Sequence, residues 1–117
     1  MSSNVKYLEI WLADLPLIEG SHVQGGKRPV LIVSNDRANR TSPVVMAVPL
    51  TSRLKRMDIL THIKFEGQGL RGPSVALVEQ LGVMDKSRLI CKLGSLNSLD
   101  DCGRIKKAIS EHLALAA

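Results

Sequence analysis

The sequence has 117 residues, of which 44% are hydrophobic and 23% are charged. This length suits one domain with its own core, and the composition is too apolar for a disordered chain, so we expect a single domain over residues 1–117. Sixteen Lys and Arg against eleven Asp and Glu give a formal net charge of +5, which favours an acidic partner: nucleic acid, an anionic membrane or an acidic protein.

The first half of the chain predicts strands separated by one long loop. Alternation of apolar and other residues with period two predicts a strand at about 7–14. Three glycines among the residues of 16–27 predict a long loop. The continuous apolar, β-branched run over 29–33 is typical of a buried strand, and 43–50 repeats the pattern. Because proline cannot donate to a strand ladder, Pro49 predicts that the residues after it lie at a strand end or an edge.

The second half predicts more strands and then a helix. Short strands are expected at about 61–65, 74–79 and 89–93, between Gly-rich or charged turns. After them, Ser98 with Asp101 three residues later resembles a helix capping box. Apolar residues then recur at steps of three and four, as on one face of a helix. They are Leu99, Cys102, Ile105, Ile109, Leu113 and Ala116. The pattern therefore predicts a mainly β fold with a C-terminal helix, a small barrel.

Cysteine and histidine usage predicts neither a disulfide framework nor a metal site. Cys91 and Cys102 form no Cys-x-x-Cys pair, and we expect two reduced thiols. His22, His62 and His112 are scattered without metal-ligand spacing, so we expect no metal. The start of the chain carries no apolar signal core, and no stretch approaches the roughly 18 apolar residues of a membrane span. We therefore expect a cytoplasmic protein.

A nucleic-acid site in this chain would have to rely on charge and hydrogen bonds rather than on base stacking. The aromatic residues are Tyr7, Trp11 and Phe65 alone, too few for modules that stack bases on a sheet. Basic residues gather at predicted loop ends, although charged residues there usually serve only to solvate loops. They are Lys27, Arg28, Arg37, Arg40, Arg53, Lys55 and Arg56. From the residues alone, the chain is a basic, anion-binding β domain.

Four sequence blocks resemble the MazF/PemK toxins. The first consists of Ile10–Leu15 and then Gly25–Asp36, which begins with Gly25-Gly26-Lys27-Arg28-Pro29. The others are Val48–Ser52, Ser74–Gln80 and Met84–Leu89, in the order and spacing of the family. The resemblance implies an SH3-like barrel shared with CcdB, a homodimer, and sequence-selective cleavage of single-stranded RNA without metal or another cofactor. It also implies inhibition by a cognate antitoxin.

The resemblance also implies roles for single residues. The Arg of the Arg-Pro pair and the Thr of the Pro-x-Thr-Ser block are catalytic in the family, which points to Arg28 and Thr51. Arg28 would hold a phosphate with its fork of donors, and Thr51 would donate its hydroxyl to the same group. Gln80 matches a position that contacts RNA. The expected RNA-binding residues are His22, Lys27, Ser52, Arg53, Lys55, Arg56 and Gln80.

One loop departs from the family, and two other functions stay open. Members commonly have Gly-Ser-Glu-Gln before the double glycine, whereas residues 20–24 are one residue longer and place His22 where Glu is usual. The preferred cleavage sequence therefore does not carry over, and His22 is either a general base or a solvated loop residue. The alternatives are a CcdB-like gyrase poison and a non-catalytic barrel that binds RNA or protein.

Overall fold

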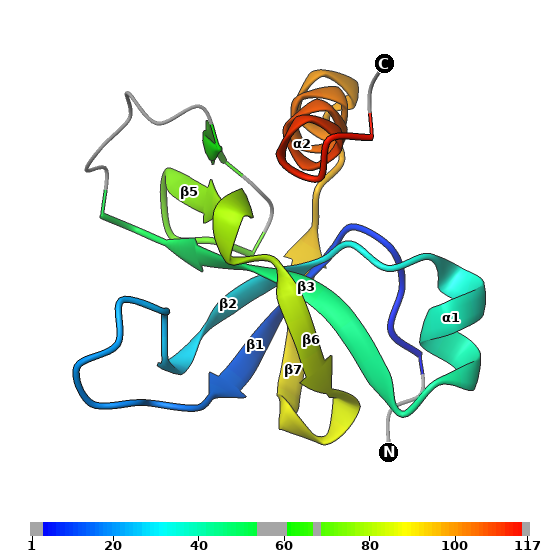
Figure 1. Ribbon diagram of the computed structural model, residues 1–117. Coiled ribbons are helices and arrows are strands. Elements are labelled where there is room, and N and C mark those ends of the chain that lie inside the picture. The colour runs from blue at the N-terminus through cyan, green and yellow to red at the C-terminus, as the bar shows by residue number, and fades with distance from the viewer. Residues whose placement is uncertain (1–3, 54–60, 67–68, 116–117) are drawn as a thin grey trace.

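The computed structural model describes residues 4–53, 61–66 and 69–115, and its seven strands form one bent antiparallel sheet (Figure 1). Its strands are β1 (Glu9–Leu15), β2 (Gly26–Ile32), β3 (Val44–Thr51), β4 (His62–Phe65), β5 (Ser74–Leu77), β6 (Gly82–Asp85) and β7 (Leu89–Ser95). The strand order is β4-β5-β3-β2-β1-β7, with β6 paired to β3 outside this path. The helices are α1 (Asp36–Thr41) and α2 (Leu99–His112), with short 3-10 turns η1 (Val78–Gln80) and η2 (Lys86–Arg88).

The predicted mainly β fold with a C-terminal helix is confirmed. The strand predicted at 74–79 ends at Leu77, where η1 begins, and α1, β6 and the two 3-10 turns were not predicted. Helix α1 has no apolar periodicity; its start is fixed by Asn35, whose side chain accepts a hydrogen bond from the Ala38 amide. Strand β6 has only four residues, among them Gly82, and it forms by pairing with β3. In the described part of the chain, neither helix is long and apolar enough to cross a membrane.

Strand β3 continues past Pro49 and ends at Thr51, so Leu50 and Thr51 lie at the strand end, as the sequence predicted, and the strand changes its partner at Pro49. Val30 of β2 lies opposite Pro49, whereas the next residue, Leu50, lies opposite Ala76 of β5. Proline has no backbone N–H, so it fits at the point where β3 leaves one ladder for the next. The change of partner bends the sheet, which gives the barrel-like shape and places Thr51 at the end of β3 beside β5.

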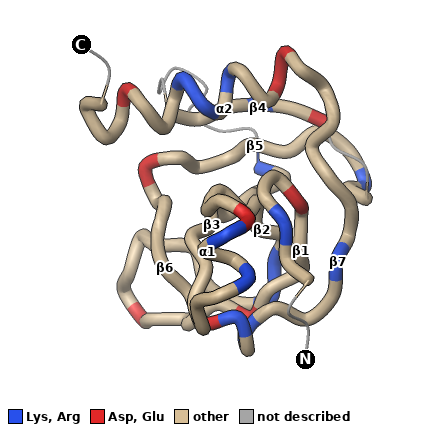
Figure 2. Tube along the Cα trace, turned by 90° about the vertical axis from the view of Figure 1, so that its right-hand side faces the viewer, with Lys and Arg blue, Asp and Glu red and all other residues tan. Residues whose placement is uncertain are grey.

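Both faces of the central strands are buried, which explains their continuous apolar sequence. One face carries Ile10, Leu31 and Val48 toward α2, where they pack with Ile105 and other core residues. The opposite face carries a second cluster of Val5, Trp11, Ala13, Val30, Ile32, Val45 and Ala47. Helix α2 covers the first cluster across one end of the sheet (Figure 1) and carries charges of both signs along its length (Figure 2). The Ser98 hydroxyl accepts a hydrogen bond from the Asp101 amide, so the predicted cap is confirmed.

Glu9 is a buried acid that joins β1 to β7. Its carboxylate accepts hydrogen bonds from the Trp11 indole (3.0 Å) and the Lys6 amide (2.8 Å), and it pairs with the Lys92 ammonium at 2.9 Å. Burial alone would raise the pKa of Glu9, but the hydrogen bonds from Trp11, Lys92 and Lys6 outweigh it and hold the pKa below its ordinary value. The charged carboxylate therefore stabilises the fold.

Glu9→Gln is expected to lower the free energy of unfolding by about 1–3 kcal/mol at neutral pH, because the buried charge pair is lost. A pKa that is lowered by folding gives stability that is present above the ordinary carboxyl pKa and is lost as the pH falls through the folded-state value. Urea unfolding at several pH values should show this acid-side loss in the wild type and less of it in the variant. Glu19→Gln, at an exposed loop acid, is the control. If the free energy of unfolding had the same value and the same pH dependence in Glu9→Gln and in the wild type, the prediction would be contradicted.

Candidate nucleic-acid groove

The ends of β2 and β3 and the segment 69–74 enclose a groove of about 860 Å³. We call it the Arg28–Thr51 groove. It is lined by Leu12, Lys27, Arg28, Pro29, Leu50, Thr51, Ser52, Arg53, Gly69, Leu70, Arg71, Gly72, Pro73, Ser74 and Leu93.

Arg28 presents part of its guanidinium group to this groove. The side chain is half-buried, and its Nε donates a hydrogen bond to the Gly25 carbonyl at 2.8 Å. Within the described residues, no side chain or backbone group bonds its two terminal nitrogens. A guanidinium that is held at Nε and open at both terminal nitrogens suits a bidentate contact with phosphate oxygens.

Thr51 lies at the same rim because of the register between β2 and β3. Val30 lies opposite Pro49; Arg28 comes two residues before Val30 and Thr51 comes two residues after Pro49. In an antiparallel pair such steps lead to the same edge. The Thr51 oxygen accepts a hydrogen bond from the Arg53 amide at 3.2 Å, which leaves its proton available for donation. Arg28 and Thr51 are 23 positions apart in the sequence, and both line this groove, as predicted for two residues that act at one site.

The groove is positively charged. Lys27, Arg28, Arg53 and Arg71 line it, and none of the lining residues in the described part of the chain is acidic. Within the described part of the chain, no carboxylate forms an ion pair with any of the four. Uncompensated cations around a hollow raise the local concentration of anions. Arg71 was missed by the sequence analysis, although a basic residue in the turn Leu70-Arg71-Gly72-Pro73 was a usable sign.

The other predicted RNA-binding residues divide into three groups. Ser52 and Arg53 line the groove together with Lys27, as expected. Lys55 and Arg56 lie outside the described residues. Gln80 and His22 do not line this groove, and neither do the additional basic residues Arg37 and Arg40 of α1.

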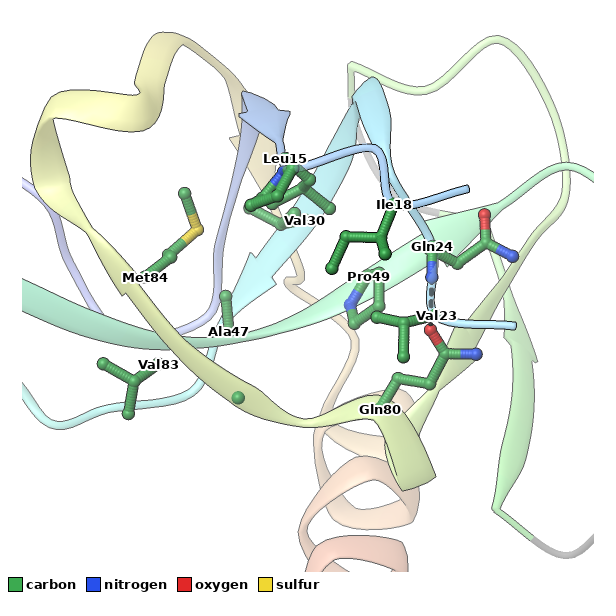
Figure 3. A pocket seen from close by; sticks show the side chains of 12 residues that line it. Leu15, Ile18, Val23, Gln24, Val30, Ala47, Pro49, Gln80, Val83 and Met84 are labelled. Atoms are coloured by element: carbon green, nitrogen blue, oxygen red, sulfur yellow. Dashed lines mark hydrogen bonds between the residues drawn. The ribbon is translucent and has the colours of Figure 1, made fainter. Parts of the chain in front are cut away.

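Gln80 lies instead in a second hollow, of about 240 Å³, beneath the loop between β1 and β2 (Figure 3). Its side-chain oxygen accepts a hydrogen bond from the Gln24 amide at 2.7 Å, and its side-chain nitrogen donates to the His22 carbonyl at 3.3 Å. The His22 side chain is exposed. Roles of Gln80 in RNA contact and of His22 in proton transfer stay predictions.

A polar cluster fixes the turn that carries Gln80. Glu79 accepts a hydrogen bond from the Thr61 hydroxyl at 3.0 Å, and its other oxygen lies 2.8 Å from Nε2 of His62. Burial alone would raise the pKa of Glu79, but these contacts outweigh it and lower that pKa. In the described residues, no group of three or more His, Cys, Asp or Glu side chains could hold a metal ion.

Comparisons with known proteins match this chain over nearly its whole length. The family described as "PemK-like, MazF-like toxin of type II toxin-antitoxin system" matches residues 6–113. Endoribonuclease EndoA of Bacillus subtilis (strain 168) is 34% identical over 113 residues, which cover 95% of this chain and 96% of that protein.

Solved structures share the fold at lower sequence identity. MazF (Form-I) from Deinococcus radiodurans superimposes with a TM-score of 0.77 at 24% identity, over 94% of this chain and 96% of that one. An endoribonuclease in complex with its cognate antitoxin, from a mycobacterial species, gives a TM-score of 0.75 at 24% identity, over 100% of this chain and 99% of that one. The bent sheet and the helix that covers it are therefore a recurrent architecture.

Proposed function

The chain belongs to the family of PemK-like, MazF-like toxins of type II toxin–antitoxin systems, and from this membership we propose that it is an endoribonuclease that cleaves single-stranded RNA. The cleavage is sequence-selective and uses no metal. The observation that carries the proposal is the Arg28–Thr51 groove, which an open guanidinium edge and a hydroxyl both line and whose described lining residues include no acid.

RNA brings its own nucleophile, which is why so few protein groups suffice. The 2′-hydroxyl oxygen attacks the adjacent phosphorus, the bond from phosphorus to the 5′-oxygen breaks, and the products are a 2′,3′-cyclic phosphate and a 5′-hydroxyl. The nucleophile loses a proton and the leaving oxygen gains one. Arg28 stabilises the charge that develops on the phosphate oxygens, and Thr51 donates a hydrogen bond to the same group. Because an arginine pKa exceeds about 12, we assign Arg28 electrostatic stabilisation first and acid catalysis second.

The alternatives lack an observation of this kind. A CcdB-like gyrase poison or a non-catalytic barrel has no need for an arginine and a threonine at one groove. The buried positions of Trp11 and Phe65 also remove both from any base-stacking surface.

A cleavage assay in EDTA tests the proposed function. The purified protein is incubated with a long mixed-sequence RNA, and the ends of the products are mapped and their phosphates identified. We expect discrete cuts at a recurring sequence, each with a cyclic phosphate and a 5′-hydroxyl. Intact RNA at high protein concentration would overturn the proposal, and trapping of gyrase on DNA would replace it with the first alternative.

The same proposal includes partners. We infer a homodimer and a cognate antitoxin whose acidic, disordered segment lies across the positive groove and excludes RNA. The place of action is the cytoplasm, and residues 1–117 act as one domain. Saturating antitoxin should then abolish cleavage, and sedimentation should give twice the mass of 12.8 kDa.

Arg71→Ala is expected to weaken RNA binding by about tenfold and to reduce the salt slope by about 0.7, which is the contribution of one phosphate contact on a single strand. Fluorescence anisotropy with a labelled RNA at several salt concentrations measures both quantities. Arg40→Ala removes the same charge from α1, outside the groove, and should change neither. Equal slopes for Arg71→Ala and the wild type would remove Arg71 from the RNA path.

A further inference from the structure

A chain of contacts runs from the turn η1 to the guanidinium of Arg28. Gln80 bonds the Gln24 amide at 2.7 Å and the His22 carbonyl at 3.3 Å. The residue after Gln24 is Gly25, whose carbonyl accepts the hydrogen bond from Nε of Arg28 at 2.8 Å. Figure 3 shows Gln80 reaching from one wall of the second hollow toward Gln24 on the other. Gln80 thus touches the loop segment that holds Arg28, and it does so from outside the groove.

These contacts join the turn η1 to the loop before Gly25, and the two segments differ in how firmly they are held. Val78 of η1 is fully buried, and its amide bonds the Thr61 carbonyl at 3.0 Å, while Glu79 is held by Thr61 and His62. The loop that precedes Gly25 is far more exposed: Leu17 is 82% exposed and Val23 is 62% exposed. Little apolar burial therefore fixes the loop, and its position depends on a few polar contacts.

Gly25 supplies the other restraint on this loop. A Cβ atom at this position would lie 2.4 Å from the Pro16 carbonyl oxygen and 2.8 Å from Cα of Leu17, so only glycine allows the two ends of the loop to come this close. This packing holds Gly25 from one side, and the two hydrogen bonds of Gln80 hold Gln24 and His22 from the other.

We propose that Gln80 is a positioning residue for Arg28: its amide fixes the loop at Gln24, so that the Gly25 carbonyl holds the guanidinium with its terminal nitrogens toward the groove. The catalytic part of this inference rests on the proposed function. Gln80 acts through the loop rather than on the RNA, and Arg28 in a less defined position stabilises the transition state less well.

Enzyme kinetics separate this role from a direct RNA contact. Gln80→Ala should lower kcat about tenfold, with KM within about twofold and the cut sites unchanged, because binding groups in the groove stay in place. Gln80→Glu keeps an acceptor for the Gln24 amide and should recover most of the rate. Val83→Ala changes an exposed apolar residue of the same hollow and should behave as the wild type. A raised KM or new cut sites in Gln80→Ala would show that Gln80 reads RNA and would overturn the positioning role.

Amide hydrogen exchange of the RNA-free protein tests the same contact without catalysis. Exchange at the Gln24 amide, followed by NMR, should be at least about tenfold faster in Gln80→Ala and near the wild-type rate in Gln80→Glu and Val83→Ala. Unchanged exchange in Gln80→Ala would overturn the inference whether or not RNA is cut. A wild-type protein that leaves RNA intact would instead overturn the proposed function, and the exchange result would still decide whether Gln80 holds the loop.

Discussion

Arg28→Ala is expected to reduce the rate of RNA cleavage by about 10²–10³-fold, while RNA affinity weakens far less. The reason lies in the geometry of the groove. The guanidinium is held at Nε by the Gly25 carbonyl and is open at its terminal nitrogens, so it is set to meet the oxygens of a phosphate. Charge on those oxygens grows as the 2′-oxygen attacks, and a group that meets it gains more in the transition state than in the ground state. Single-turnover rates and equilibrium binding to a short RNA measure the two effects separately.

Thr51→Ala should cause a loss of the same order, and the double variant should lose less than the product of the two, because both side chains act on one charge. Arg28→Lys should not restore the rate, since an ammonium cannot make the two-pronged contact. Arg40→Ala on α1 is the charge-matched control with an unchanged rate. Circular dichroism must first show that each variant is folded. A folded Arg28→Ala protein that cuts RNA at a near wild-type rate would falsify the catalytic assignment.

The parts of this site that were predictable are those that follow from strand pairing. Arg28 and Thr51 lie in short blocks at the start of one strand and the end of the next, and antiparallel pairing brings such ends together. Arg71 was missed because its segment, 69–74, leads into β5. This segment lies at the groove because the end of β3, after Pro49, pairs with β5. A change of strand partner depends on packing between distant segments, which a local pattern does not contain.

Gln80 shows a different limit of sequence analysis. Its match to an RNA-contacting position indicates that it is near the substrate path, but not what its amide bonds in the free protein. In the structure, the side-chain oxygen and nitrogen of Gln80 both form hydrogen bonds with the backbone of the loop between β1 and β2. In the same way, α1 and β6 were not predicted because they are short, lack a clear periodicity and depend on a cap and a partner strand.

Gly69→Ala is expected to have the largest effect on stability of any glycine substitution in the groove. Gly69 has φ of +88°, a conformation that costs roughly 1–2 kcal/mol for a residue with a Cβ atom. That Cβ would also lie 1.9 Å from the Leu93 carbonyl oxygen and 2.4 Å from the Leu93 carbonyl carbon, so strand β7 or the segment that carries Arg71 has to move. Together the two effects should lower the free energy of unfolding by about 2–4 kcal/mol, because backbone overlap adds to the conformational strain.

Thermal unfolding should therefore show a fall in Tm of roughly 8–16 °C for Gly69→Ala, at about 4 °C per kcal/mol for a chain of this size. Two other glycines give matched controls, because a Cβ atom at either would meet nothing within 4 Å. Gly72→Ala, in the same segment, should leave Tm nearly unchanged, and Gly103→Ala, inside α2, should raise the stability by up to about 1 kcal/mol through helix propensity. If Gly69→Ala were as stable as Gly72→Ala, the close approach of segment 69–74 to β7 would be wrong, and with it the part of the groove that Arg71 lines together with Arg28 and Thr51.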